Sequence, residues 1–112
     1  MEPDQVRIDD GVAVIHVDGS DCAALWPLVE PSLAAPDTTL VGVVLDFSAV
    51  TYLNSMNIAS VIGFRTRLAK HATKVAMCGL NEQLRSIFRV LKLERLFDLE
   101  LDQSAAITKV KA

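Results

Sequence analysis

This sequence of 112 residues is poor in several features that would direct its function. Its two cysteines, Cys22 and Cys78, lie far apart and outside CxxC spacing, so we expect buried thiols rather than a zinc site. Lysine and arginine number 11 against 14 acidic residues, and the net charge of −3 argues against a nucleic-acid partner. No apolar run reaches the roughly 18 residues that a transmembrane helix needs. The amino-terminal segment is acidic where a signal peptide is basic, so a cytoplasmic protein is expected, without membrane insertion.

What the sequence does contain is a large apolar fraction. Apolar residues make up 51% of the chain and charged residues 22%, a composition typical of folded proteins. A domain of this length buries roughly 65% of its unfolded surface, which is enough for a core without disulfides or metals. No internal repeat, low-complexity stretch or linker is visible, so residues 1–112 are expected to form a single domain.

The first half of the chain predicts strands on either side of one helix. Residues 6–17 hold two β-rich runs around an Asp-Gly pair, a pattern that predicts a hairpin. A helix is expected over residues 22–33, kinked or broken by Pro27 and Pro31. Residues 41–47 are apolar and rich in β-branched types, which is typical of a central strand covered on both faces.

The second half alternates helices and strands. Apolar residues recur at helical spacing over 56–70, and Asn81 is expected to cap a further helix. That helix has an apolar stripe consisting of Leu84, Ile87, Phe88 and Leu91. The remaining predicted elements are a strand over 74–78, an edge strand over 97–101 and a helix over 103–110. The succession predicts an α/β fold, with about four helices packed on a mixed sheet of four to five strands.

The sequence holds few residues suited to catalysis. It contains no GxSxG, P-loop, HExxH or Gly-rich phosphate cradle. His16 is interpreted as a surface or hydrogen-bonded strand residue, and His71 as a cation near the end of a helix. Asp46 has no second acidic residue at ligand spacing and is interpreted as a carboxylate that orders its loop. We therefore expect that the protein is not an enzyme, and that it has no catalytic residues and binds no metal or cofactor.

One segment stands out for its chemistry, residues 52–58 with the sequence Tyr-Leu-Asn-Ser-Met-Asn-Ile. It lies between the predicted central strand and an amphipathic helix. A hydroxyl at the start of a helix can accept a backbone N–H as a cap, or carry a phosphate that the free N–H groups stabilise. Both roles are compatible with Ser55, and spacing alone favours the cap.

The stretch Val43–Ile58, together with residues 75–79 and 84–97, resembles the STAS domain of bacterial anti-sigma factor antagonists. The resemblance extends over nearly the whole chain and implies an STAS-like single domain. In that family the loop after the central strand reads Asp-Ser-x-Gly-Leu, and its serine is phosphorylated by a kinase that is also the anti-sigma factor. Ser55 matches that serine and is the implied phosphoacceptor.

The mechanism that the resemblance implies is partner switching in transcription regulation. The unphosphorylated antagonist binds a serine kinase of the GHKL ATPase type and so frees a sigma factor. Phosphorylation releases the antagonist, and a PP2C-like phosphatase resets it. A phosphoserine carries about −1.5 to −2 charges, so placing it in a docking surface weakens binding to any partner without a matched cation.

Two residues depart from the family's motif. Asn54 replaces the aspartate and Asn57 replaces the glycine, although asparagine tolerates a positive φ at such a position. The chain is then either an antagonist with a co-adapted kinase, or an STAS module that binds without being switched, in a transporter or signalling complex. A small-ligand binding protein or enzyme is a third hypothesis, supported only by the general α/β architecture.

The partner surface is expected around the predicted phosphoacceptor, where the first helical turn points side chains outward. The residues expected there are Asn54, Met56, Asn57 and Ile58. Met56 and Ile58 have an alternative role in the core. Asp21, before the first predicted helix, lies near a position that family members use at the same surface, and its alternative role is a helix cap.

Overall fold

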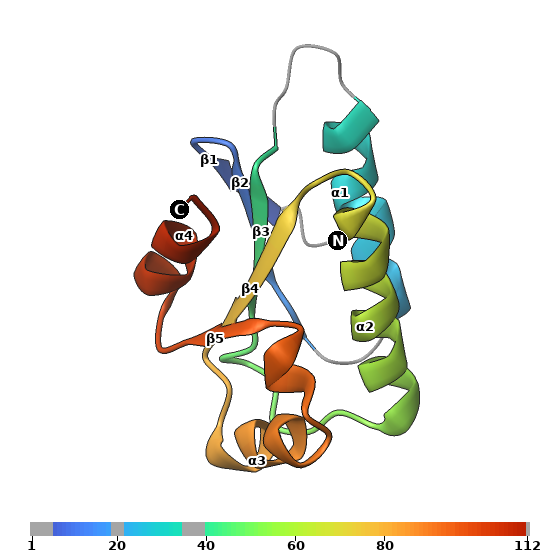
Figure 1. The fold of residues 1–112 in the computed structure, drawn as a ribbon, viewed down its shortest axis with the longest axis vertical. Helices are drawn as coiled ribbons and strands as arrows, with labels where there is room; N and C mark the ends of the chain where they lie inside the picture. The colour runs from blue at the N-terminus through green and yellow to red at the C-terminus, as the bar shows by residue number, and fades with distance from the viewer. Residues whose placement is uncertain (1–5, 19–21, 35–39, 112) are drawn as a thin grey trace.

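The computed structural model describes residues 6–18, 22–34 and 40–111. In this part of the chain, five strands form one sheet with helices on both of its faces (Figure 1). The strands are β1 (Val6–Asp9), β2 (Val12–His16), β3 (Gly42–Asp46), β4 (Lys74–Cys78) and β5 (Asp98–Glu100). The helices are η2 (Cys22–Ala24), α1 (Leu25–Ala34), α2 (Ser55–Ala69), α3 (Glu82–Val90), η3 (Leu93–Arg95) and α4 (Gln103–Lys111).

The strands lie in sequence order, β1-β2-β3-β4-β5. β1 and β2 form the predicted antiparallel hairpin, and every later pair is parallel because a helical connection returns the chain to the same end of the sheet. The turn of the hairpin has φ of 53° at Asp10 and 82° at Gly11, the positive values that a type I′ turn requires. The predicted α/β fold with a mixed sheet is confirmed.

The two prolines of the first helical segment do not break α1, one of the two outcomes that the sequence predicted. Residues 22–24 form a 3-10 turn, and α1 follows without interruption to Ala34. Pro27 lies in the first turn of α1, where its missing N–H would have no partner within the helix. Pro31 lies inside α1, and the helix continues past it. The break in helical geometry therefore precedes both prolines.

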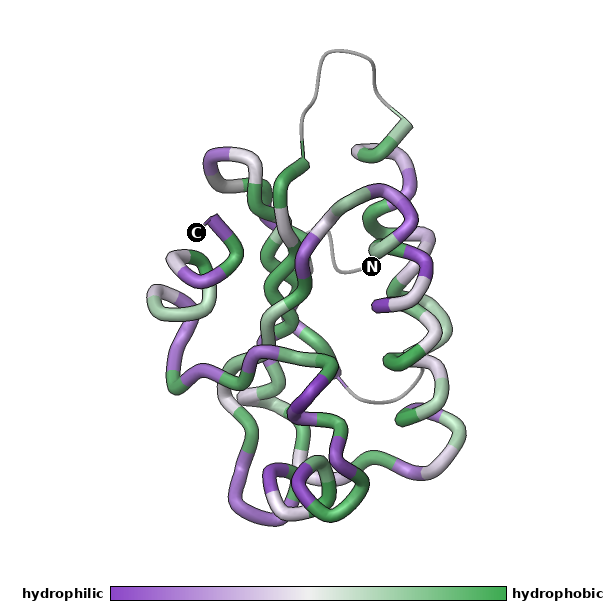
Figure 2. The backbone as a smooth tube through the Cα atoms, in the orientation of Figure 1, coloured by the Kyte–Doolittle hydropathy of each residue, from purple (hydrophilic) through white to green (hydrophobic). Residues whose placement is uncertain are grey.

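β3 is the central strand, and it is buried on both faces as predicted. Val43 and Leu45 belong to the larger core cluster beneath α1 and α2, whereas Val44 belongs to the smaller cluster beneath α4. Figure 1 shows α1 and α2 on one side of the sheet and α4 on the other, and Figure 2 shows hydrophobic residues concentrated along the central strands. α4 packs closely, because a Cβ added at Gly42 would lie 2.5 Å from Val110.

Asp46 orders the carboxyl end of β3, as the sequence interpretation proposed. Its carboxylate accepts a hydrogen bond from the Ser48 N–H at 2.9 Å and one from the Gln103 amide at 2.6 Å. Burial raises the pKa of Asp46, but these hydrogen bonds outweigh that effect, so its pKa lies below the ordinary value. His16 is half-exposed and places Nδ1 3.6 Å from the same carboxylate. These contacts fasten α4 to the sheet.

α3 lies across the carboxyl ends of the parallel strands (Figure 1). Its predicted cap is confirmed, because Asn81 accepts a hydrogen bond from the Leu84 N–H at 2.8 Å. Leu84 and Phe88 are buried, but the predicted stripe is wrong at Leu91, which is 52% exposed. The helix ends at Val90, so Leu91 is its C-cap, and the next residue, Lys92, has a left-handed conformation with φ of 61°.

Candidate functional site

The segment between β3 and α2 is held in place from both ends. Phe47, Val50 and Leu53 are buried in the larger core cluster. The backbone of Asn54 is extended, and its side chain accepts a hydrogen bond from the Asn57 N–H at 2.8 Å. Asn54 is therefore the N-cap of α2. The direction in which α2 leaves the loop is fixed by this cap and by the buried residues before it.

Ser55 is the first residue of α2, and its side chain is exposed. The sequence left two roles open for its hydroxyl and favoured that of a cap. The structure gives the cap to Asn54 instead, so the favoured role is wrong for Ser55. The reason is that α2 begins one residue earlier than the periodicity indicated, which places Ser55 inside the helix rather than before it. The Ser55 hydroxyl is therefore not the cap of α2.

The electrostatics of this helix end favour an anion. The first turn of α2 contains no acidic residue. The first N–H groups of a helix have no partner within the helix, and the helix dipole adds a partial positive charge at the same end. Asn54 satisfies one of these N–H groups, that of Asn57. A phosphate attached to Ser55 would be placed where the remaining charge stabilises it.

The structure separates the predicted partner-surface residues. Met56 is 79% exposed, so its alternative role as a core residue is wrong, and Asn54 is also exposed. Ile58 is half-buried and packs partly against the core. Asp21 lies outside the described residues.

Asn57 differs from the prediction in two respects. Its side chain is only 8% exposed, and its Oδ1 accepts a hydrogen bond from the Cys22 N–H at 3.0 Å. The expectation that Asn57 points outward is therefore wrong, because the third position of this helix faces the start of the segment before α1. The conformation at residue 57 is that of a regular helix, so the positive φ expected from the family's glycine is not adopted. Asn57 joins two segments instead of presenting a side chain to a partner.

An apolar groove of about 410 Å³ lies beside Ser55. We call it the Ser55 groove; it is lined by Tyr52, Leu53, Ser55, Ile58, Ser86, Ile87, Val90 and Leu91. Three large side chains at its edges are unusually open to solvent, Tyr52 at 62%, Val90 at 77% and Leu91 at 52%. A cluster of exposed apolar side chains is typical of a surface that binds another protein.

The sequence interpretation missed the contribution of α3 to this surface. Only residues 52–58 were singled out, although the second wall of the groove comes from the end of α3. A signal was available at Val90, which is apolar at a position outside the buried stripe of the helix. Such a residue has no role in the core, but its proximity to Tyr52 and Leu53 is visible only in the structure.

The structure offers no obvious site for a metal ion in the part that it describes. No three histidine, cysteine, aspartate or glutamate residues among residues 6–18, 22–34 and 40–111 gather around one point. Cys22 and Cys78 are both buried free thiols. Burial, with smaller contributions from Asp46 and Asp102, raises the pKa of Cys78 to about 12. Cys78 therefore stays protonated at neutral pH. Within the described ranges, none of the helices combines the length and the apolar character that crossing a membrane demands.

Comparisons with known proteins agree with this geometry. Residues 5–106 match the family model of the STAS domain, whereas no curated protein matches the chain in sequence. A candidate anti-sigma factor antagonist from Thermotoga maritima has a similar structure, with a TM-score of 0.78 and 16% identity over 96% of this chain and 93% of that one. A variant of Moorella thermoacetica RsbS gives a TM-score of 0.75 and 16% identity over 96% of each chain.

The same fold occurs in a protein of a different kind. A sulfate transporter family protein from Wolinella succinogenes gives a TM-score of 0.74 and 13% identity, over 94% of this chain and 88% of that one. At these levels of sequence identity, structural similarity establishes the fold but not the function, which has to be argued from the site.

Proposed function

This chain belongs to the STAS domain family, and on that premise we propose that it is an anti-sigma factor antagonist that works by partner switching. In this proposal residues 1–112 form a single STAS domain, which regulates transcription in a bacterial cytoplasm without catalysing a reaction itself. Its partners are a serine kinase of the GHKL ATPase type, which is also the anti-sigma factor, and a PP2C-like phosphatase.

The observation that carries the proposal is the position of Ser55. Its side chain is exposed at the start of α2, the adjacent Asn54 provides the cap, and an apolar groove lies alongside. A kinase can therefore reach the hydroxyl without unfolding the helix. A partner that covers the groove also covers Ser55, so modification and binding use the same surface.

The switch follows from the charge that is added. The γ-phosphoryl group of kinase-bound ATP is transferred to the Ser55 oxygen, ADP leaves, and the hydroxyl proton passes to a base on the kinase. The new group carries about −1.5 to −2 charges, which an apolar interface cannot cover without a large desolvation cost. The free antagonist tolerates it, because the start of α2 has no acidic residue and attracts anions. Water and the phosphatase then restore the hydroxyl and release inorganic phosphate.

The test is phosphorylation by a GHKL-type kinase encoded beside the gene of this chain. With ATP, we expect mass spectrometry to find a single phosphate, located on Ser55. The Ser55→Ala variant should remain unmodified, while Ser86→Ala, which changes the other serine of the groove, should be modified like the natural chain. Absence of modification, together with kinase binding that Ser55→Asp does not weaken, would contradict the proposal.

A second candidate function is an interaction module that binds its partner without being switched, in a transporter or signalling complex. Asn54 favours it, because an amide stands where the family's motif has a carboxylate. The variant Asn54→Asp distinguishes the two functions, since aspartate caps a helix as well as asparagine does. If the missing charge prevents phosphorylation, Asn54→Asp should be phosphorylated while the natural chain is not. Equal phosphorylation of both chains would exclude the unswitched module.

A further inference from the structure

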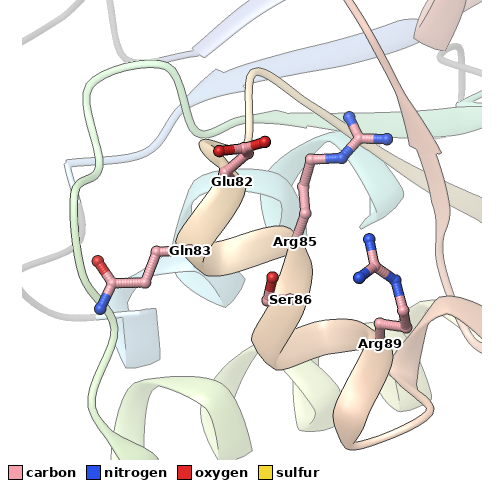
Figure 3. A pocket seen from close by; sticks show the side chains of 5 residues that line it. All are labelled: Glu82, Gln83, Arg85, Ser86 and Arg89. Carbon is pink, nitrogen blue, oxygen red and sulfur yellow. The ribbon is translucent and has the colours of Figure 1, made fainter.

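The exposed side of α3 carries two arginines that have no acidic partner in the described part of the chain. Arg85 and Arg89 lie one helical turn apart and line a hollow of about 510 Å³ together with Glu82, Gln83 and Ser86. Figure 3 shows both guanidinium groups extending to the same side of α3, while Gln83 points away from them. Like charges at this spacing destabilise a helix slightly, so folding gives no reason for the pair.

The charge of this hollow is opposite to that of the whole chain. The chain has a net charge of −3, whereas the hollow holds two guanidinium groups and one carboxylate, that of Glu82. Arg89 is exposed and Arg85 is half-buried. A guanidinium group is well matched to carboxylates, which it can bind through two parallel hydrogen bonds. The hollow is therefore suited to acidic side chains.

The arginine hollow and the Ser55 groove share a rim. Ser86 lines both, so the apolar surface and the positive surface lie on adjacent sides of α3. A ligand that covers both needs apolar side chains along one side and acidic side chains along the next. An amphipathic helix with an acidic flank has this arrangement, and helices of this kind commonly bind in apolar grooves.

We propose that the Ser55 groove and the Arg85–Arg89 pair form one docking surface for an acidic amphipathic helix of a partner protein. Its apolar side contacts Tyr52, Val90 and Leu91, and its carboxylates contact the two arginines. This proposal rests on the proposed function in that the partner is the protein that recognises Ser55. It also explains how the switch acts, because a phosphate on Ser55 stands in the groove and repels an acidic occupant.

The experiment uses two synthetic helical peptides with the same apolar side. One carries glutamates along the adjacent side, and the other carries lysines at the same positions. Each is titrated into the isotope-labelled chain and followed by NMR chemical shifts. The glutamate peptide should shift residues 52–58 and 84–91 and bind about tenfold more tightly than the lysine peptide, since charge complementarity decides between them.

Charge reversal on the protein tests the role of the arginines. The double variant Arg85→Glu and Arg89→Glu should prefer the lysine peptide. Because Arg85 is half-buried, Arg89→Glu alone is a second variant, and it should reduce the preference for the glutamate peptide several-fold. The control is Lys70→Glu with Lys109→Glu, which makes the same change in net charge at two exposed positions, the C-cap of α2 and a position within α4, and should leave the preference unchanged.

The outcomes separate this proposal from the proposed function. Failure of both peptides to bind, equal binding of the two, or an unchanged preference in the arginine variants would overturn the docking surface, even if a kinase modifies Ser55. Ser55→Glu should weaken binding of the glutamate peptide about threefold and strengthen binding of the lysine peptide. If the arginine results hold and Ser55→Glu has no effect, the docking surface stands and the switch at Ser55 is wrong.

Discussion

The helices α2 and α3 begin with the same cap and differ in the three residues that follow it. Asn54 and Asn81 both have extended backbones, and each accepts a hydrogen bond of 2.8 Å from the N–H group three residues on. After the cap, α3 continues with an acidic residue, Glu82, and α2 with the hydroxyl of Ser55. The partial positive charge at the start of a helix is thus compensated by the Glu82 carboxylate in α3, whereas no acidic residue compensates it in the first turn of α2.

The third positions differ as well. Leu84 in α3 is fully buried in the core, whereas Asn57 in α2 is buried and bonded to the backbone of Cys22. α3 is therefore anchored by apolar packing, and α2 is anchored at its start by a specific polar contact. The comparison shows that apolar packing holds the start of α3, while polar contacts hold the start of α2 and leave Ser55 exposed in a first turn without an acidic residue.

The largest change in stability is expected from substitution at the third position of α3, which is Leu84. Leu84→Ala should lower the free energy of unfolding by about 2–5 kcal/mol, because it leaves a cavity beneath α3. Urea denaturation followed by circular dichroism measures this change. Gln83→Ala, at an exposed position of the same turn, is the control and should change stability little. A loss as small as that of the control would show that α3 does not depend on Leu84.

Asn57→Ala should lower the free energy of unfolding by less, about 1–3 kcal/mol. The buried N–H of Cys22 then loses its bond to the Asn57 amide. Hydrogen exchange at that N–H should become faster than in the natural chain, and the exchange of residues in α3 should not change. Unchanged protection at Cys22 would mean that the contact does not hold the two segments together.

The two caps, Asn54 and Asn81, should contribute equally to the stability of the chain. Asn54→Ala and Asn81→Ala are each expected to cost about 1 kcal/mol, since both remove one side-chain acceptor from the same position of a helix. Asn81→Ala also removes the hydrogen bond that the Asn81 amide donates to the Thr51 carbonyl at 3.3 Å, which is exposed and adds little to stability. Denaturation of the two variants under identical conditions makes the comparison. A difference of more than about 1 kcal/mol between them would contradict the equivalence of the two helix starts.

The smallest effect concerns the charge after the cap. Ser55→Glu should stabilise the chain by about 0.3–1 kcal/mol at low salt, and Glu82→Gln should destabilise it by a similar amount, because each changes the acidic charge at a helix start. Both effects should decrease with added salt. Thermal unfolding at low and high ionic strength measures them. Destabilisation by Ser55→Glu would argue against a favourable site for phosphate there.

The sequence predicted most of the fold because the signals are local. The Asp-Gly turn, the unbroken apolar run of β3 and the cap at Asn81 each determine structure within a few residues. The sequence was less informative at the prolines, because a proline in the first turn of a helix costs little and the tolerance of Pro31 depends on packing around α1.

The candidate site was predicted only in part, for physical reasons that particular residues illustrate. Ser55 lies on a motif, and the position of that motif between a strand and a helix is visible in the sequence. The burial of Asn57 depends on Cys22, which lies 35 residues earlier. The exposure of Leu91 depends on where α3 ends, and the left-handed conformation of the next residue, Lys92, is one that a lysine rarely adopts. The shared rim at Ser86 requires α3 to lie across the ends of the strands.

The burial of Cys78 provides a way to observe the opposite side of the molecule. Its thiol lies beneath α4 beside Ala106 and Val110, and its raised pKa keeps it protonated. A thiol-specific label can react with it only after α4 moves away from the sheet, since the thiol is both covered and slow to form a thiolate. The labelling rate of Cys78 therefore reports how often α4 detaches from the sheet. Measured with and without a ligand in the Ser55 groove, it would show whether binding on one face of the sheet changes the packing of α4 on the other.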